Sequence, residues 1–315
     1  MRLAIINDYH GLAREAADWS RLPPDVTLEV HGRVSDAEAP ALLSDCEMVV
    51  TSREETRFDP ALLGRLPKLK LLVTHGSSNA ALDLPALAAR GVTVCGTTLG
   101  LEMATVELTW GLILGLVKHI PAEDRAIRRG GWGAGLGRGL TGRTLGVLGL
   151  GQLGEGVARV GLSFGMKVIA WSENLSTARC EEVGARLVTK NELFARSDVL
   201  SIHTRYGPRS RGLVSRDELS AMKPDAILIN TSRGAIVEEA ALIEALREGR
   251  IGGAGLDVFD REPLPADHPL RKLPNTLLTA HIGGRTRENF LARYRDALED
   301  VLAFLHGKPI RTLQP

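Results

Sequence analysis

The stretch 144–164, TLGVLGLGQLGEGVARVGLSF, constrains the fold of this chain more than any other. Its apolar run at 145–148 predicts a buried strand, and the periodic apolar residues after it predict a helix. Between the two stand Gly149, Gly151 and Gly154, in the spacing G-x-G-x-x-G. This succession is typical of a dinucleotide-binding unit. The first glycine makes the tight turn, the second lets the backbone approach a pyrophosphate, and the third lets helix and strand pack closely.

A further predicted strand at 167–171 follows at the spacing that such a βαβ unit requires. The segment is therefore predicted to bind a dinucleotide, with the phosphate anion at the amides of the helix N-terminus. The cofactor-binding residues predicted in the turn are Gly149, Gly151, Gln152, Leu153 and Gly154. The alternative is a glycine-rich turn that holds no ligand.

The rest of the chain alternates short apolar strands with amphipathic helices, which is typical of parallel βαβ units. Its 315 residues suffice for about two domains. In the first part, strands are predicted at 3–6, 48–50, 69–73 and 92–95, and helices at 11–19, 36–43 and 82–89. A long helix is predicted at 101–119, closed by Pro121, and the glycine-rich segment 130–139 is predicted to be a loop.

After the glycine turn the same alternation predicts a second, doubly wound parallel sheet of five or six strands. An amphipathic helix at 238–248 lies within this part, and a last helix at 287–305 ends the pattern. The further strands are predicted at 187–188, 199–203, 226–230, 253–258 and 276–279.

The composition of the chain limits which binding partners and which cellular compartment we expect. The net charge of +1 gives no reason to expect a nucleic-acid or membrane-surface partner. The longest apolar run, at 108–117, is about half the length needed to span a bilayer. Cys46, Cys95 and Cys180 are unclustered, which favours buried thiols in a reduced cytoplasmic protein over disulfides or a metal site. We therefore expect a cytoplasmic protein with no metal.

One connection in the first part stands out, LLVTHGSSNAALD at 71–83. A buried strand runs into His75, Gly76 and Ser77 before the next helix begins. Small residues at the carboxyl end of a strand leave backbone amides available to an anion. The alternative is an ordinary loop between strand and helix.

Three charged residues follow three predicted strands of the second sheet: Arg233, Glu262 and His281. Ligands of open α/β sheets bind beyond the carboxyl ends of the strands, so these side chains are candidates for a site beside a nicotinamide. Each also has a plainer interpretation: Arg233 as a surface charge, Glu262 as a cap or a solvent-facing carboxylate, and His281 as a loop histidine.

Together the three suit the reduction of a 2-keto acid by hydride. Arginine offers the planar fork that binds a carboxylate and polarises a carbonyl. Histidine gives or takes a proton near neutral pH. A neighbouring carboxylate favours the protonated imidazole.

The motifs GLGQLG, NTSRGAIVEEAAL, GLDVFDREPLP and TAHIGG together resemble the D-isomer-specific 2-hydroxyacid dehydrogenase family, in the right order over essentially the whole chain. The resemblance implies an α/β fold with two doubly wound parallel-sheet domains, a Rossmann coenzyme domain inserted in a flavodoxin-like substrate domain. The substrate domain would comprise 1–99 plus 286–315, and the NAD(P)-binding domain 100–285. It also implies a homodimer paired through the coenzyme domain.

By position, the resemblance makes Arg233 the substrate-binding cation, His281 the acid/base and Glu262 its partner. It makes the amides around Gly76 and Ser77 a cradle for the substrate carboxylate, with His75 facing the substrate. The further cofactor-lining positions that it implies are Thr105, His203, Thr204, Thr231, Ser232, Asp257 and Gly283.

One position leaves the choice between NAD and NADP undecided. The second coenzyme-domain strand should end in an acidic residue that binds the adenosine ribose, but Ser172 stands there, with Glu173 next. If Glu173 turns inward it favours NAD, because an acidic side chain repels a 2′-phosphate. If Ser172 acts with Arg205, NADP becomes the alternative. We expect NAD. Arg205, Arg209 and Arg211 either flank the adenine end or solvate a loop.

The predicted function is therefore NAD(P)-dependent interconversion of a 2-keto acid and a D-2-hydroxy acid. Two alternatives stay open: a phosphite-type dehydrogenase on the same fold, and a non-catalytic protein that senses NAD(H). The sequence names neither the substrate nor the direction of the reaction.

Overall fold

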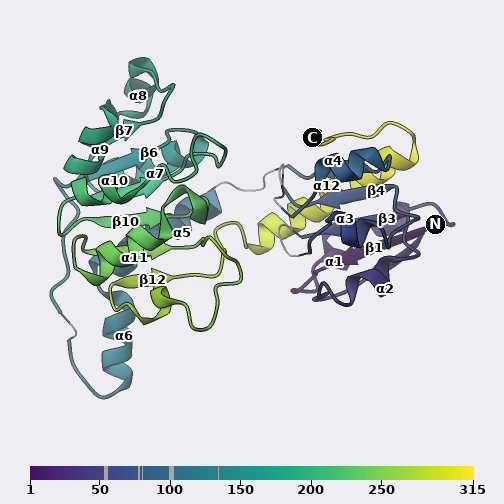
Figure 1. Cartoon of the computed structure of the whole chain (residues 1–315), viewed down its shortest axis with the longest axis horizontal. Helices are drawn as coiled ribbons and strands as arrows, with labels where there is room; N and C mark the ends of the chain where they lie inside the picture. Colours follow the sequence, from purple (N-terminus) through teal and green to yellow (C-terminus); the bar gives the residue numbers. More distant parts are fainter. Residues whose placement is uncertain (53–55, 77–78, 80, 99–102, 134) are drawn as a thin grey trace. The chain divides into compact units, whose positions relative to one another are not determined.

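The computed structural model of the chain describes residues 1–52, 56–76, 79, 81–98, 103–133 and 135–315 (Figure 1). The chain divides into two compact units, Met1–Leu101 with Arg285–Pro315, and Glu102–Gly284. Each unit has its own parallel sheet and its own cores.

The described residues of the first unit form a five-stranded parallel sheet in the order β2-β1-β3-β4-β5. Its strands are β1 (Arg2–Ile6), β2 (Thr27–Val30), β3 (Met48–Thr51), β4 (Leu71–Thr74) and β5 (Thr93–Gly96). This is the flavodoxin-like order that the family resemblance implies. The helices are α1 (Ala13–Ala16), α2 (Ala39–Leu43), α3 (Pro60–Leu63), α4 (Leu84–Ala89) and α12 (Arg287–Leu305), with a 3₁₀ turn η1 (Trp19–Arg21).

The two faces of this sheet are covered by different parts of the chain, because side chains alternate along each strand. Leu3 and Ile5 of β1 share one core with Phe290 and Tyr294 of α12. The residue between them, Ala4, lies in the other core, with residues of α2, α3 and α4. The last helix of the sequence thus returns to the first unit.

The described residues of the second unit form a seven-stranded parallel sheet in the order β12-β11-β10-β9-β6-β7-β8. Its strands are β6 (Thr144–Leu148), β7 (Lys167–Trp171), β8 (Arg186–Leu187), β9 (Val199–Ile202), β10 (Ile227–Asn230), β11 (Gly253–Leu256) and β12 (Thr276–Leu278). This is the Rossmann order extended by one strand. The prediction of five or six strands was too low, although each of the seven strands had a predicted range, β8 included at 187–188.

The helices of the second unit are α5 (Met103–Val117), α6 (Ile120–Arg128), α7 (Gln152–Ser163), α8 (Thr177–Val183), α9 (Lys190–Arg196), α10 (Arg216–Ala221) and α11 (Glu239–Arg247), with 3₁₀ turns η2 (Gly234–Ile236) and η3 (Pro269–Lys272). Helix α5 packs closely on the sheet, since a Cβ at Gly115 would lie 2.6 Å from Leu277. Among the described residues no single helix is long and apolar enough to cross a membrane; α5 and α6 pass that test only as a pair, which is bent by 61°.

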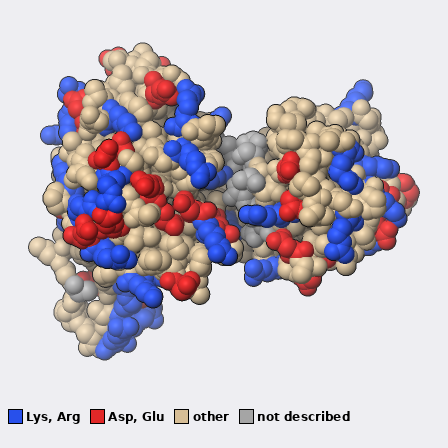
Figure 2. Space-filling model, viewed as in Figure 1, with Lys and Arg blue, Asp and Glu red and all other residues tan. Residues whose placement is uncertain are grey.

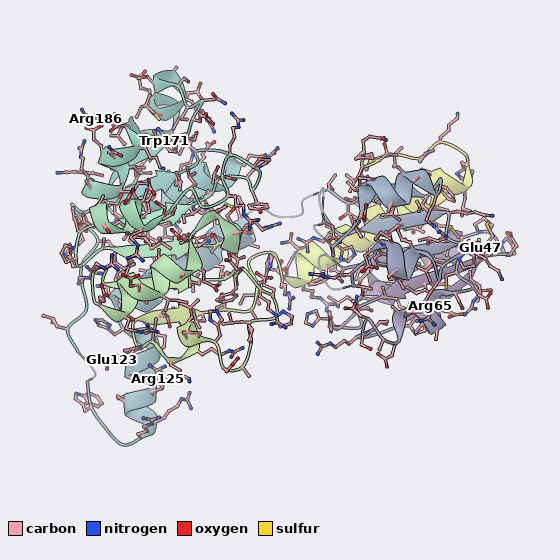
Figure 3. The ribbon with its side chains drawn as sticks, viewed as in Figure 1. Glu47, Arg65, Glu123, Arg125, Trp171 and Arg186 are labelled. Atoms are coloured by element: carbon pink, nitrogen blue, oxygen red, sulfur yellow. The ribbon has the colours of Figure 1, made fainter. Side chains whose placement is uncertain are left out.

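Pro121 does not end the long helix as predicted but stands in the first turn of a separate helix, α6. Proline is well tolerated there, because its missing N–H has no helical partner in the first turn. Basic side chains gather over α6, which carries Arg125 and Arg128 (Figure 2). Glu123 and Arg125 extend from the same helix (Figure 3).

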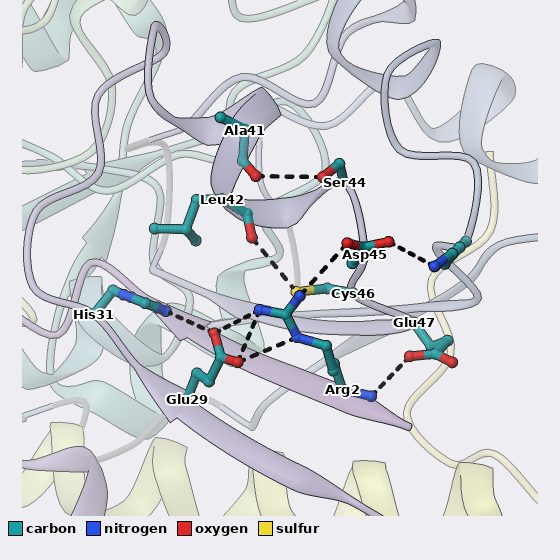
Figure 4. Close-up of polar contacts among 10 residues, drawn as sticks. Arg2, Glu29, His31, Ala41, Leu42, Ser44, Asp45, Cys46 and Glu47 are labelled. Carbon is teal, nitrogen blue, oxygen red and sulfur yellow. Dashed lines mark hydrogen bonds and ion pairs between the residues drawn. The ribbon is translucent and has the colours of Figure 1, made fainter.

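An ion-pair network ties the strands of the first unit together near the start of β1 (Figure 4). The Arg2 guanidinium donates to Glu29 of β2 at 2.8 Å, and its amide donates to Glu47 at 2.7 Å. Asp45 lies 3.8 Å from Arg2 and 2.5 Å from Lys68. Arg2, Asp45, Glu47 and Lys68 lie at or before the amino ends of their strands, and Glu29 lies within β2. This is opposite the edge where ligands of such sheets bind, and we interpret the network as structural.

Candidate active site at the carboxyl edge of the strands

The turn between β6 and α7 has the shape that a dinucleotide phosphate requires. Gly149 has a φ of +97°, and a Cβ there would lie 2.7 Å from the Thr204 nitrogen. A Cβ at Gly154 would lie 2.0 Å from the Gly149 oxygen, so the helix packs directly on the turn. A Cβ at Gly151 would meet nothing within 4 Å, and no side chain caps α7 at that residue. The open space and uncapped helix N-terminus fit a pyrophosphate.

The end of β7 places an ion pair where the adenosine ribose is expected. Trp171 is the last residue of this strand (Figure 3), and Ser172 and Glu173 follow it. Arg209 donates to the Glu173 carboxylate at 3.0 Å, and both side chains are exposed. Arg211 donates to the hydroxyl of Tyr206 at 3.2 Å. One of the three arginines noted in the sequence is therefore beside the acidic residue.

Four predicted cofactor residues lie together where β9 and β10 end: His203, Thr204, Thr231 and Ser232. The Ser232 hydroxyl donates to the Thr204 carbonyl at 2.7 Å, and the hydroxyls of Thr231 and Thr109 are 2.9 Å apart. His203 Nε2 is 2.7 Å from the Ser201 hydroxyl, whereas its buried Nδ1 has no partner among the described residues. Burial lowers the pKa of His203 to about 4, so this imidazole is neutral at physiological pH.

Arg233, Glu262 and His281 follow three strands that are neighbours in the sheet, β10, β11 and β12. His281 Nδ1 lies 2.6 Å from Glu262 Oε2. The other carboxylate oxygen, Oε1, accepts a hydrogen bond from the Phe259 amide at 2.9 Å. Since an ionised carboxylate only accepts, His281 Nδ1 is the donor of this pair.

The charges around Glu262 keep its carboxylate ionised. Burial alone would raise its pKa, but the hydrogen bond and charge of His281, the Phe259 amide and the charge of Arg233 outweigh burial, and the pKa is lowered. The influence of Arg233 on this pKa means that the predicted cation acts on the histidine–carboxylate pair. The charge of Arg233 thus favours the ionised form of Glu262, as the neighbouring His281 does.

Asn230, the last residue of β10, fixes the backbone that carries Arg233. Its side-chain amide donates to the Arg233 carbonyl at 2.9 Å, and its side-chain oxygen accepts from the Ser232 amide at 3.0 Å. A Cβ at Gly234 would lie 2.0 Å from the Phe259 carbonyl carbon, so the two segments touch backbone to backbone. This close approach brings the segment after β10 against the segment that leads to Glu262.

Asp257 holds the segment that carries His281. Its carboxylate, in a residue only 1% exposed, accepts from the Ile282 amide at 2.8 Å, the Gly283 amide at 2.9 Å and the Thr279 hydroxyl at 2.5 Å. Its carbonyl accepts from the His281 amide at 2.8 Å. His281 has a φ of +51°, a left-handed conformation that non-glycine residues seldom adopt without such support.

Thr105 of α5 supports the same segment, since its hydroxyl donates to the Gly283 carbonyl at 3.1 Å. Thr105, Asp257 and Gly283 were predicted as cofactor-lining positions. In the structure their polar groups bond to one another across the base of the His281 segment.

The predicted substrate loop at 75–77 differs in two ways from the prediction. The Gly76 amide is not available to an anion as predicted, because it donates to the Thr97 hydroxyl at 2.9 Å. His75 is 1% exposed, and its ring packs edge-on against Tyr294 with centroids 4.7 Å apart. Ser77 lies outside the described residues.

The supporting roles of two residues in the site could not be predicted from the sequence. Asn230 looks like the end of a strand, although an asparagine before T-S-R is a signal for a side-chain-supported turn. Asp257 looks like one more polar residue after a strand, and nothing local indicates its donors at 279–283. Among the described residues no group of three or more histidine, cysteine or acidic side chains could hold a metal ion.

We predict that Asp257→Asn destabilises the second unit by roughly 3 kcal/mol, because an amide group cannot accept all the bonds of a buried carboxylate. Urea unfolding measures the loss. Asp267→Asn, at an exposed position after the same strand, serves as the control and should change stability by less than about 0.5 kcal/mol. Equal stabilities of the two variants would contradict the role given to Asp257.

Residues 110–283 match the model of the D-isomer specific 2-hydroxyacid dehydrogenase, NAD binding domain. The chain is 36% identical to the glyoxylate reductase of Aeropyrum pernix over 97% of its own length and 90% of that protein's. It is 33% identical to the D-3-phosphoglycerate dehydrogenase of Archaeoglobus fulgidus, but it spans only 57% of that protein's length.

Among solved structures, a phosphoglycerate oxidoreductase of Vibrio cholerae superposes with a TM-score of 0.89 at 35% identity, over 98% of this chain and 99% of the other. The chain therefore belongs to the D-isomer-specific 2-hydroxyacid dehydrogenase family, oxidoreductases that act on CH–OH groups, and it carries that family's NAD-binding domain.

Proposed function

We propose that this chain interconverts a 2-keto acid and a D-2-hydroxy acid by hydride transfer with NAD. The unit Glu102–Gly284 is the coenzyme domain of this proposal, and the unit formed by Met1–Leu101 and Arg285–Pro315 is its substrate domain. The observation that carries the proposal is the 2.6 Å pair of His281 and Glu262, with Arg233 in the segment after the neighbouring strand β10.

When bound, the nicotinamide supplies or accepts the hydride. Arg233 binds the carboxylate of the 2-keto acid and polarises its carbonyl, which makes the carbonyl carbon more electrophilic. The alkoxide that develops on the carbonyl oxygen takes a proton from His281 Nε2. Glu262 accepts from Nδ1 throughout, so it orients the ring and stabilises the imidazolium before the proton leaves. In the reverse direction His281 removes the hydroxyl proton.

We predict that His281→Ala lowers kcat by about a hundredfold or more, because the proton transfer loses its positioned acid. NADH binding, followed by its fluorescence, should be retained, since His281 does not form the phosphate turn. The control is His306→Gln, because His306 is an exposed histidine that follows α12 in the other unit. Normal turnover in the His281 variant would refute the assignment.

We propose NAD as the preferred cofactor, with Glu173 disfavouring the 2′-phosphate of NADP. The partner of Glu173, Arg209, weakens this discrimination because it offers a cation at the same place. Glu173→Gln is expected to raise kcat/KM with NADPH relative to NADH by about tenfold, and Arg209→Gln to lower the same ratio. Parallel assays with both cofactors measure the ratio. An unchanged ratio in both variants would place the discrimination elsewhere.

We also propose a homodimer paired through the coenzyme domain. Supporting this, Trp132 and Leu136 are each 92% exposed, and Ile120 and Ile127 of α6 are 53% and 50% exposed. Large apolar side chains gathered on a surface favour a protein contact. Light scattering should give the mass of two chains, and Trp132→Asp should shift it toward one. A monomeric wild-type chain at micromolar concentration would contradict the proposal.

The partner proposed for the site is a small 2-keto or 2-hydroxy acid, with neither nucleic acid nor membrane involved. We propose a cytoplasmic location, because Cys46, Cys95 and Cys180 are buried free thiols, which persist in reducing compartments.

A further inference from the structure

Two successive backbone amides after β11 donate to two different carboxylates. The Phe259 amide donates to Glu262 Oε1 at 2.9 Å, which is part of the candidate site. The next amide, that of Asp260, donates to Glu239 Oε2 in a long hydrogen bond of 3.4 Å. The two planar peptide groups meet at Phe259, so a rotation of one of them displaces the other. The position of Glu262 is therefore linked to that of Glu239.

Glu239, the first residue of α11, is oriented by His268. Its Oε1 lies 3.0 Å from His268 Nε2. The other ring nitrogen, Nδ1, accepts from the Leu270 amide at 3.4 Å and so caps η3. Because Nδ1 accepts, the neutral ring carries its proton on Nε2 and donates it to Glu239. One nitrogen of His268 thus caps η3, and the other orients the carboxylate of Glu239.

The turn η3 also holds the chain on the far side of Glu262. Its Leu270 is 1% exposed and belongs to the core of the second unit. Its Arg271 donates to the carbonyls of Leu264 and Pro265, at 2.8 Å each. The turn therefore holds the chain after Glu262 directly, whereas its hold on the chain before Glu262 passes through the histidine–glutamate pair.

Packing fixes only one side of the segment that leads to Glu262. On the side of β10, a Cβ at Gly234 would lie 2.5 Å from the Asp260 nitrogen, so the two backbones touch. On the side of α11 and η3 there is a cavity, lined by Glu239, Phe259 and Leu270 among others. Since an open space does not resist movement, the hydrogen bonds to Glu239 must fix the segment on that side.

The charges around Glu239 make a donor necessary at this place. Burial and then the charge of Glu239 raise the pKa of Asp260, while the charges of Arg211 and His268 lower it. The carboxylates of Asp260 and Glu239 thus repel each other, although the Asp260 amide bonds to Glu239. The His268 N–H holds the Glu239 carboxylate in place against this repulsion.

We propose that Glu239 and His268 are positioning residues of the reaction, which hold the segment 259–262 through the Asp260 amide and thereby keep the Glu262 carboxylate against His281. This rests on the proposed function, in which Glu262 orients the imidazole that gives the proton. Neither residue of the pair touches the reacting atoms in this proposal.

Two substitutions of His268 separate its two bonds. In His268→Asn the side-chain oxygen takes the place of Nδ1, so the cap of η3 is retained and the donor to Glu239 is lost. In His268→Gln the amide nitrogen takes the place of Nε2, so the donor to Glu239 is retained. Both changes leave the net charge of the neutral ring unaltered. Melting temperatures show that both variants are folded.

His268→Asn is expected to lower kcat for reduction by roughly fivefold, because a displaced Glu262 no longer orients His281. KM should change by less than about twofold, since Arg233 keeps its own bonds to Asn230. The pH at which kcat falls to half should move down by about 0.5 or more, because reduction needs the protonated imidazole that Glu262 favours. His268→Gln should stay within about twofold of the wild-type chain and keep its pH profile.

Glu239→Ala removes both bonds of the carboxylate and should lower kcat by roughly tenfold. In that background His268→Asn should have no further effect, because the histidine acts through Glu239. The matched control is Glu238→Ala, which removes the same charge from the preceding residue. Glu238 is exposed and its side chain makes no capping bond to α11, so kcat should be retained.

Three results would overturn the positioning role. One is wild-type kinetics in His268→Asn, and another is an equal loss in His268→Asn and His268→Gln. The third is a lower kcat with an unmoved pH profile, which would indicate a merely structural effect.

A chain that reduces no 2-keto acid would refute the proposed function instead, and the positioning role is then tested without turnover. The imidazole of His281 is titrated by NMR, its signal being identified as the one lost in His281→Ala. The midpoint of this titration should move down in His268→Asn and stay unchanged in His268→Gln. Equal midpoints in the two variants would refute the positioning role as well.

Discussion

The bonds that Asp257 accepts hold the candidate site in its geometry. The carboxylate is buried, and its side-chain donors all belong to the short segment around His281. That segment cannot shift without leaving a buried charge unpaired, which costs several kcal/mol (about 3 or more). A left-handed histidine is therefore stable here. Its imidazole, fixed in this way, meets Glu262 at 2.6 Å.

The order of the strands explains why residues far apart in sequence meet. Because β10, β11 and β12 are neighbours and parallel, the segments after them leave the same edge of the sheet. Arg233, Glu262 and His281 each stand in one of these segments. The backbone contact at Gly234 then closes the distance between the first two segments. The glycine turn follows β6 of the same parallel sheet, so the catalytic candidates and the phosphate-binding turn share one edge.

The sequence predicts the parts that depend on local patterns. The bounds of β7 and α12 agree with their predicted ranges, and the glycine turn has the predicted geometry. The strand β2 was missed, because it is a half-exposed edge strand with no apolar run. The bonds of Asp257 and of the Gly76 amide could not be predicted, since their partners lie elsewhere in the chain. Local sequence patterns identify the residues of the site. The partners of each residue depend on contacts between distant parts of the chain, which such patterns do not show.

The most direct measurement follows NADH absorbance with the wild-type chain and glyoxylate, pyruvate, hydroxypyruvate or phenylpyruvate, and then determines the chirality of the product. The account predicts oxidation of NADH by at least one of these acids and a D-2-hydroxy acid wherever the product is chiral. No oxidation with any 2-keto acid, while NADH binding is shown separately, would contradict it. Phosphite oxidation or NAD(H) sensing would then explain the fold better.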